Sequence, residues 1–352
     1  MKKITLAVLL AIITSAALNA YNPPVYGDSY LELSSAKTLT GGTSVSGGPV
    51  FNGSPDSIIT NPAISAREQR VVLNVGYTAL FSMDDANAKK FGSAFQTSFL
   101  VPFKIFVLTG YMNGTFVPFE DLNLKNSLNF KAAVAKPITE KFDLGLGFSS
   151  GFCWGAGKDA MIAGDIGGVY TIGDLGFMKD FRIGVSVLNL GKTFSKTAVA
   201  GIYEGDGFYP NIVTLKAGVA ASLFRNEIFD IAYAFDLSLP SCLNLIADAS
   251  LQFSLKDMIV LSVSEKMNIR EMAAGKVYMI PAIGLNFKFS FDFGSSNYMK
   301  KNGWEQSEFN VYSAYKNINT TVTAASLGLD FMLGMKDTTP PVIELWLGDD
   351  DE

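Results

Sequence analysis

The sequence predicts an all-β fold: a closed antiparallel transmembrane β-barrel of about 14 strands with a small N-terminal plug segment. Three observations predict it. The chain opens with a secretory leader, long runs alternate large apolar with small or polar residues, and connections of two lengths separate these runs. Together they indicate a secreted chain that crosses a membrane with strands.

The first 20 residues, MKKITLAVLLAIITSAALNA, have the layout of a signal peptide. Lys2 and Lys3 form the basic start, an apolar stretch follows over Ile4–Ile13, and small residues come last. The apolar stretch is too short to span a bilayer as a helix. We therefore predict a cleaved signal at residues 1–20, cut after Ala20 or Ala17, and a location in the outer membrane.

After Ser65 the apolar residues recur with period two, which indicates strands that have one apolar face. In Phe142–Ser150, FDLGLGFSS, every second residue is Phe or Leu, and Ile283–Asp292, IGLNFKFSFD, repeats the pattern. The predicted strands cover Val71–Phe81, Ala94–Val101, Ile105–Phe116, Ser127–Lys136, Phe142–Cys153, Met161–Ile172, Phe181–Leu190, Val213–Phe224, Ile228–Leu239, Leu243–Leu255, Met258–Asn268, Tyr278–Asp292, Phe309–Tyr315 and Thr321–Leu333.

The character of the two strand faces favours a membrane barrel over a soluble sandwich, whose strands also alternate. The apolar face is large and aromatic, in a chain with 27 Phe and 13 Tyr, and the other face is rich in Gly, Ser, Ala and Asn. Closure into a barrel also removes the edges that many long strands would otherwise expose. We therefore place the barrel at residues 67–335.

The connections fall into two classes if the first strand runs outward. The inner connections are mostly tight, and the outer ones include the long segment Gly191–Pro210, as expected of outer-membrane barrels. Gly294–Ser307 would be a long inner connection, so either it is an unusual periplasmic excursion or the strand parity changes there. Residues 336–352 leave the strand pattern and end in acidic residues, which predicts a periplasmic tail.

The segment Phe51–Ser65, FNGSPDSIITNPAIS, is too rich in turn residues for a strand. Asn61 precedes Pro62 and is biased toward a turn, Asp56 or Ser57 has the chemistry to cap a short helical turn, and Ile58 and Ile59 supply apolar surface to bury. The pattern predicts a compact knot; the alternative is a lead-in to the first strand at the inner rim.

With its leader, this SPDSIITNPA segment and about 14 strands, the chain resembles the FadL-type long-chain fatty-acid transporter superfamily. VSVLNLGKTF and FYPNIVTLKAGVA are similar to a passage of the PorV-type branch, and the chain looks closest to spirochaete members. Ile64 stands where the family commonly has Gly. The resemblance implies that residues 21–66 fold into the barrel as a hatch, with a motif formed by Asp56, Asn61, Pro62 and Ala63.

The resemblance implies that the barrel binds or transports hydrophobic small molecules such as long-chain fatty acids. The alternatives are a PorV-like anchor or shuttle for secreted proteins and a general diffusion porin. The partners expected are the lipid bilayer of the outer membrane, a hydrophobic small molecule and, for the PorV-like role, a periplasmic or secreted protein.

Two further groups of residues attract functional hypotheses. Gly110, Asn113, Gly114 and Pro118 punctuate the third strand, which predicts either a lateral exit through the barrel wall or an ordinary start of a loop.

The second group is ionic. Lys216, Asp236 and Asp248 fall on faces with small residues and predict a network of lumen charges. A lattice that holds the barrel's shape is favoured over ligand binding.

Composition excludes several chemistries. The chain has no His, which rules out a Ser-His-Asp triad and a His-ligated zinc, and we predict neither an enzyme nor a cofactor. Without Lys2 and Lys3 there are 26 basic and 33 acidic residues, a net charge of −7, which argues against nucleic acid. Cys153 and Cys242 either pair or remain as two small buried residues.

Overall fold

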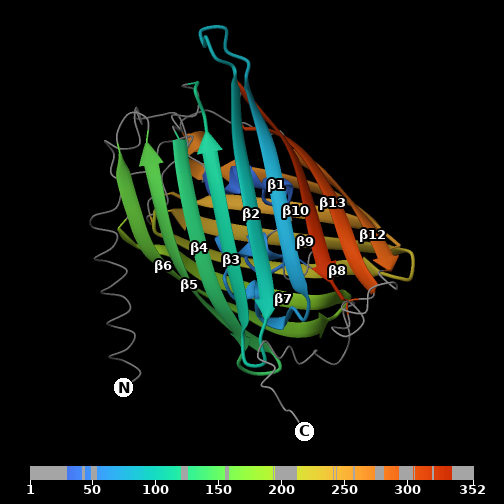
Figure 1. The fold of residues 1–352 in the computed structure, drawn as a ribbon. Coiled ribbons are helices and arrows are strands. Elements are labelled where there is room, and N and C mark those ends of the chain that lie inside the picture. Colours follow the sequence, from blue (N-terminus) through green and yellow to red (C-terminus); the bar gives the residue numbers. More distant parts are fainter. Residues whose placement is uncertain are drawn as a thin grey trace.

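The computed structural model describes residues 30–41, 44–48, 54–119, 126–154, 158–192, 194, 212–240, 242, 244–256, 258–273, 281–292, 304, 306–318 and 321–334. Fourteen strands in the described residues form one closed barrel (Figure 1). Each strand pairs antiparallel with its neighbours in the sequence, and β1 closes the ring against β14. The predicted fold class is confirmed.

Each predicted strand corresponds to one strand of the barrel. The strands are β1 Val71–Ser82, β2 Phe91–Pro102, β3 Val107–Phe116, β4 Asn126–Pro137, β5 Phe142–Trp154, β6 Asp159–Leu175, β7 Met178–Lys192, β8 Thr214–Arg225, β9 Phe229–Pro240, β10 Ile246–Leu255, β11 Ile259–Asn268, β12 Ala282–Asp292, β13 Gln306–Asn317 and β14 Val322–Leu333. A short helix, α3 Ile269–Ala273, follows β11. The sequence pattern locates the middle of a strand well because side-chain alternation extends through it, whereas the strand ends depend on pairing.

Large apolar side chains cover the outside of the barrel. In β1 the side chains of Leu73, Val75 and Tyr77 are 46%, 43% and 47% exposed. Asn74, which lies between the first two, and Thr78, which follows Tyr77, are buried. The same alternation recurs in the other strands, and this apolar outer surface matches a hydrocarbon surrounding rather than water. Among the described residues, no helix is long and apolar enough to cross a bilayer.

The two rims of the barrel differ in the length of their connections. At one rim, which we call the short-turn rim, Pro102 joins Val107 and Leu175 joins Met178 within a few residues. At the other, the long-connection rim, the gap between β7 and β8 runs from residue 193 to 213.

The strand parity holds throughout the barrel. Because β12 and β13 are antiparallel neighbours, their connection also lies at the short-turn rim, so the predicted alternative of a parity change is wrong there. Val71 pairs with Leu333, which places the start of β1 and the end of β14 at the same rim. The signal peptide and the acidic tail lie outside the described residues.

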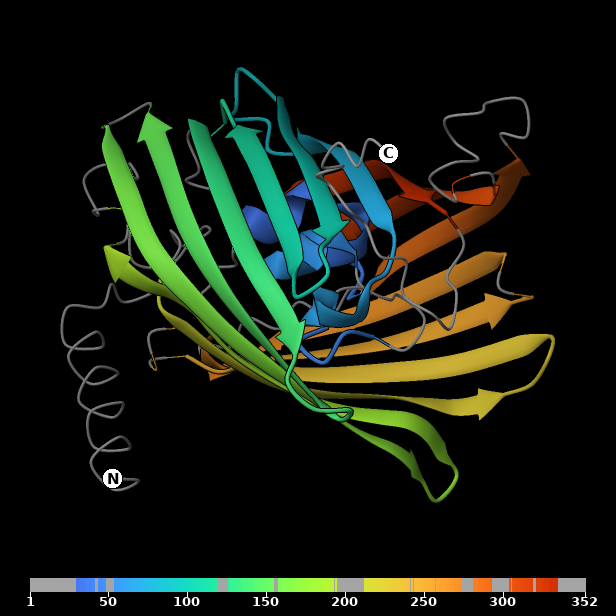
Figure 2. The ribbon, with the colours of Figure 1, turned by 60° about the horizontal axis from the view of Figure 1, so that its bottom comes forward.

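The N-terminal elements lie inside the barrel lumen (Figure 2). We call the described residues of 30–70 the hatch. It consists of three 3₁₀ helices and one short α-helix: η1 Tyr30–Ser34, α2 Ala36–Leu39, η2 Pro55–Ile59 and η3 Ile64–Arg67. Ser54 is the N-cap of η2 and makes no side-chain capping bond, so the expected capping by Asp56 or Ser57 is wrong.

Candidate functional site

The Asn61-Pro62-Ala63 turn of the hatch packs against the inner face of β5, β6 and β7. The Asn61 side chain is fully buried, and its Nδ2 donates to the carbonyls of Val45 at 2.7 Å and Gly168 at 3.1 Å. Its Oδ1 accepts the backbone N–H of Ala63 at 2.9 Å. One amide therefore closes the turn, joins two parts of the hatch and binds the barrel wall.

Glycines of the wall make this close approach feasible. A Cβ on Gly145 would lie 2.4 Å from the backbone of Ala63, one on Gly167 would lie 1.9 Å from Asn61, and one on Gly184 would lie 2.2 Å from the Val45 carbonyl. Gly145 and Gly167 are direct cross-strand partners. We call Gly145, Gly167 and Gly184 the glycine platform, because each leaves the space that hatch backbone or Asn61 occupies.

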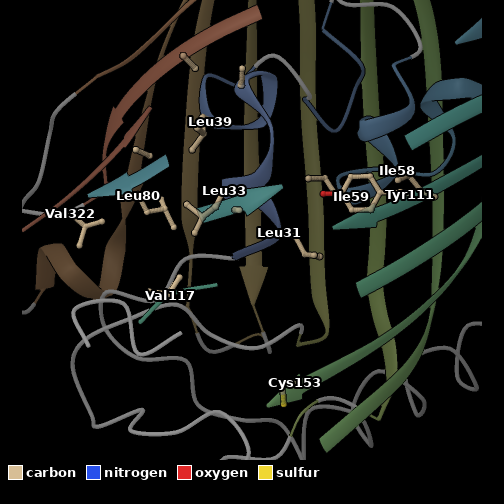
Figure 3. Packing of buried hydrophobic residues seen from close by; sticks show 14 of the residues in the cluster. Leu31, Leu33, Leu39, Ile58, Ile59, Leu80, Tyr111, Val117, Cys153 and Val322 are labelled. Carbon is tan, nitrogen blue, oxygen red and sulfur yellow. The ribbon is translucent and has the colours of Figure 1, made fainter. Parts of the chain in front are cut away.

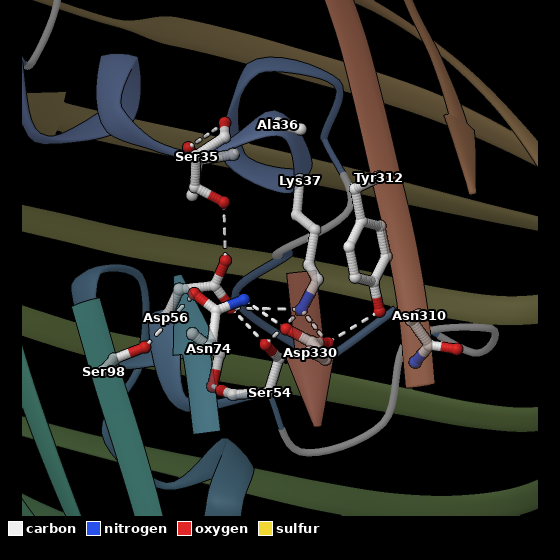
Figure 4. A network of polar contacts seen from close by, with 12 residues as sticks. Ser35, Ala36, Lys37, Ser54, Asp56, Asn74, Ser98, Asn310, Tyr312 and Asp330 are labelled. Atoms are coloured by element: carbon white, nitrogen blue, oxygen red, sulfur yellow. Dashed lines mark hydrogen bonds and ion pairs between the residues drawn. The ribbon is translucent and has the colours of Figure 1, made fainter. Parts of the chain in front are cut away.

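A second docking point centres on Lys37 of α2 (Figure 4). Its ammonium lies 2.6 Å from Asp330 Oδ2 on β14 and 4.2 Å from the ring centroid of Tyr312 on β13. The Lys37 and Asp330 side chains are each 1% exposed. The Tyr312 hydroxyl donates to Asp330 at 2.7 Å, and Asn74 of β1 donates to the same carboxylate. We call Lys37, Asp330, Tyr312 and Asn74 the lysine latch.

The motif residue Asp56 belongs to the same region of the hatch. Ser35 Oγ donates to Asp56 Oδ2 at 2.6 Å, Ser54 Oγ donates to Oδ1, and the Lys37 ammonium lies 3.7 Å away. Asp56 therefore links η2 to α2, while the Asn61-Pro62-Ala63 part of the predicted motif contacts the opposite wall. The four motif residues serve two separate docking points.

The predicted lumen charges all point inward and line one small cavity, of about 30 Å³, together with Glu32 of the hatch. Lys216 lies two residues along from Gly218, the cross-strand partner of Asp236, and Asp236 is opposite Asp248. Among the described residues, the carboxylate that Lys216 binds is Glu32, at 3.1 Å, rather than Asp236. Sequence reasoning placed these charges on the right face but missed the hatch residue between them.

The hatch supplies the remaining partners of these charges. Asp236 accepts bonds from Ser44 Oγ at 2.9 Å and the Val45 N–H at 2.8 Å, and Lys266 also binds Glu32. Burial by itself would raise the pKa of Glu32, but the ammonium groups of Lys266 and Lys216 outweigh it and hold the pKa well below its usual range. Glu32 therefore stays ionised and ties the hatch to β8 and β11.

β3, which contains the glycines of the predicted lateral exit, is a continuous strand. β3 pairs with β2 and with β4 without a register shift, and Gly110, Asn113 and Gly114 all lie within its paired part. Cβ atoms on Gly110 and Gly114 would lie 2.4 Å from the rings of Phe99 and Phe95 on β2. These glycines therefore leave space for aromatic rings to pack against β3 and do not interrupt its pairing.

The residues around this strand fit an ordinary strand end. Pro118 follows the end of β3, and buried Asn113 donates to Ser34 of the hatch at 3.2 Å. The register shifts that the structure does contain lie between β6 and β7, β7 and β8, and β8 and β9. The lateral exit stays a prediction, without a strand interruption to support it.

An apolar cluster lies inside the lumen toward the long-connection rim (Figure 3). Hatch residues Leu31, Leu33 and Leu39 belong to one cluster with lumen side chains at the outer ends of several strands. These lumen members include Leu80, Val117, Phe119, Met161, Phe194 and Val322. Ile58 and Ile59, which the sequence marked for burial, are members with exposures of 1% and 4%.

Toward the short-turn rim the lumen contains a cavity of about 720 Å³ with a largely polar lining, and a small apolar group of Val72, Leu100 and Val107 lies at the same end. Hatch residues Lys37, Arg67 and Arg70 line one side, and the inner ends of strands from β6 to β14 line the other. Arg70 binds Glu308 at 2.5 Å, and Arg67 binds Asp143 at 2.8 Å. The apolar cluster and this cavity thus occupy different parts of the lumen.

The two cysteines do not pair. Cys153 lies on β5 and is buried, whereas Cys242 lies between β9 and β10 and is exposed. The expectation of two small buried residues is therefore right for Cys153 and wrong for Cys242.

Sequence reasoning missed the residues that hold the hatch. Lys37 and Glu32 precede the quoted motif, and their partners Asp330 and Lys266 are far away in the sequence, so no spacing links them. The glycine platform did leave a signal, because Gly145 and Gly184 fall on the small-residue face of their strands. The small-residue face indicates where another segment can pack closely against the strands, but it does not identify that segment.

Comparison with known proteins adds evidence on the fold. No protein-family model matches the chain, and no curated protein is significantly similar in sequence. Among solved structures, the Ralstonia pickettii toluene transporter TbuX is similar, with 13% identity, a TM-score of 0.51, and coverage of 87% of this chain and 100% of that one. The CymD monoaromatic hydrocarbon channel has 11% identity, a TM-score of 0.51, and coverage of 89% and 100%. At these identities the likeness shows a shared fold.

Proposed function

We propose that this protein is an outer-membrane barrel that binds hydrophobic small molecules, such as long-chain fatty acids, and passes them toward the periplasm. The observation that carries the proposal is the apolar cluster inside the lumen at the long-connection rim. Because these side chains are buried between the hatch and the barrel wall, the cluster becomes a binding surface for a hydrophobic ligand when the hatch moves. The fold shared with TbuX and CymD, whose names describe them as a toluene transporter and a monoaromatic hydrocarbon channel, supports the same function.

The hatch controls passage in this proposal. Leu31, Leu33 and Leu39 form the hatch side of the apolar surface, so a ligand that enters from the long-connection rim meets the hatch first. The hatch is held by the lysine latch, by Glu32 and by the turn on the glycine platform. These contacts can open without breaking the pairing of any strand, so the hatch can move while the barrel stays closed.

Binding of labelled oleate to the purified protein in detergent tests the proposal. The variant Leu33→Gln places an amide in the apolar cluster, where Leu33 is 2% exposed, and we expect oleate to bind about tenfold more weakly, which corresponds to about 1.4 kcal/mol. The matched control Leu327→Gln changes an outward-facing leucine that is 64% exposed, and we expect it to bind like the unchanged protein. Equal binding by Leu33→Gln and the control would contradict the location of the site.

The alternatives predict different results. A PorV-like anchor or shuttle for secreted proteins would not bind oleate and would copurify with a secreted protein. A general diffusion porin would let sugars into liposomes, whereas a lumen filled by the hatch predicts little swelling. Failure to bind both oleate and toluene would overturn the transport proposal.

A further inference from the structure

The cavity at the short-turn rim has a lining rich in positive charge. Seven of its lining side chains are cationic and four are acidic. Its chemistry is therefore opposite to that of the apolar cluster, and a hydrophobic ligand does not account for it. The volume of about 720 Å³ is that of a small-molecule site.

The ion pairs of the cavity leave some of these cations without a carboxylate. Arg225 is paired twice, with Asp180 at 2.5 Å and with Asp230 at 2.7 Å. Within the described part of the chain, neither Arg182 nor Lys256 has an ion pair. Asp180, two residues from Arg182, is bound by Arg225 instead.

Arg182 is the more informative of the two. It lies near the start of β7, and its Nε is buried and lacks a hydrogen-bond acceptor in the described residues. A buried donor left without a partner costs about 1–3 kcal/mol, and more when the group is charged. A guanidinium presents a planar fork of donors that matches a carboxylate or a phosphate. In the described part of the chain no acceptor bonds Arg182 Nε, and the carboxylates of Asp180 and Asp143 act on the guanidinium without forming an ion pair with it.

The place of Arg182 also connects the cavity to the hatch. A Cβ on Gly47 of the hatch would lie 3.8 Å from Arg182 Nη1, so hatch backbone passes next to the guanidinium. The rest of the cavity extends to the turn residues Asn226, Ile228 and Lys256. The cavity therefore runs from the hatch to the rim.

We propose that this cavity binds a small anion that carries a carboxylate or phosphate group, with Arg182 as its principal contact. Lys256 adds positive charge at the rim, and Arg225 holds the carboxylate of Asp180 away from Arg182. The source of the group is either a free anion or the headgroup of an anionic lipid, which share this chemistry. This site is separate from the proposed hydrophobic site in the other half of the lumen.

Titration of the full chain in neutral detergent at low ionic strength tests the proposal, with inorganic phosphate as the probe. We expect saturable phosphate binding that is at least tenfold weaker in Arg182→Gln and partly retained in Arg182→Lys. The control Lys104→Gln removes an exposed cation of the β2–β3 turn, which does not line the cavity, and we expect unchanged binding. Absence of saturable binding to the unchanged protein, for both phosphate and the lipid probe below, would overturn the proposal.

A second variant covers the case in which Arg182→Gln does not fold. Lys256→Gln changes an exposed turn residue, and we expect a several-fold loss of affinity; unchanged binding in Lys256→Gln and in every folded Arg182 variant would overturn the site. The short-chain lipid dihexanoyl phosphatidylglycerol distinguishes the two sources. Binding of phosphate assigns the site to free anions, and binding of the lipid alone, lost in Arg182→Gln, assigns it to headgroups. Binding of toluene, which carries no charge, is expected to be unaffected by these variants, so failure of one proposal is distinguishable from failure of the other.

Discussion

Two regions of the lumen wall have different linings. Toward the long-connection rim, inward Leu, Val, Phe and Met side chains pack with the leucines of η1 and α2, while Lys216, Asp248 and Lys266 lie at the same end on β8, β10 and β11. Toward the short-turn rim, Arg, Lys, Asp and Glu side chains line a cavity of about 720 Å³. The hatch lies at the boundary and contributes to both.

The difference shows how one small segment is held in a wide barrel. Burial of apolar side chains is not directional, so the outer half provides affinity for the hatch without fixing its position. Ion pairs and hydrogen bonds are directional, so the lysine latch and Asn61 fix where the hatch sits. Variants of the lysine latch therefore test what fixes the position of the hatch, and variants of the apolar cluster test what gives it affinity for the barrel.

The largest effect is expected from the lysine latch. Lys37→Met leaves Asp330 buried without its ammonium partner, and removal of one member of a buried ion pair costs about 3–5 kcal/mol. We expect a lower urea midpoint of unfolding and, because the hatch loses its position, larger conductance in planar bilayers.

The double variant Lys37→Met with Asp330→Asn provides the check on this mechanism. It removes the uncompensated charge together with its partner, so we expect at least half of the lost stability to return. If the double variant is no more stable than Lys37→Met, loss of packing rather than the buried charge explains the effect.

The next effect concerns the apolar half. Leu39 is 2% exposed in the cluster, and Leu39→Ala is expected to lower the free energy of unfolding by about 2–5 kcal/mol. Leu327, 64% exposed on the outer face of β14, provides the comparison, because in Leu327→Ala lipid or detergent occupies the vacated space. Equal losses in urea unfolding would mean that the lumen cluster is not packed as a core.

The barrel and the hatch differ in how far the sequence predicts them. A strand signals itself locally, because Phe, Leu and Ile at alternate positions, as in Phe142–Ser150, persist whatever the partner strand is. The hatch has no period, and Lys37 with Asp330 or Glu32 with Lys266 become neighbours only once the barrel closes. Gly110 and Gly114 of β3 were hard to interpret for a related reason, since the aromatic rings that cover them come from another strand.

A smaller effect is expected at the glycine platform. Gly167→Ala places a Cβ 1.9 Å from Asn61 Oδ1, and overpacking of this kind costs about 1–3 kcal/mol. Gly164 lies on the same strand, where a Cβ would meet nothing nearer than 3.8 Å, so Gly164→Ala is the matched control. We expect proteolysis of the hatch to be faster in Gly167→Ala than in the unchanged protein, and the rate in the control to be unchanged. Identical cleavage of the two variants would show that the platform does not position the turn.

The smallest perturbation tests which half faces outward. The exposed Cys242 lies at the long-connection rim, and the buried Cys153 lies on β5, so a membrane-impermeant maleimide on whole cells distinguishes them without changing stability. If the apolar half opens to the exterior, we expect Cys242 to react on intact cells and Cys153 to react only after unfolding. The variant Cys242→Ser is expected to abolish the whole-cell signal. If Cys242 reacts only after the outer membrane is opened, the barrel has the opposite orientation. The cationic cavity would then face outward, and hydrophobic ligands would meet it first.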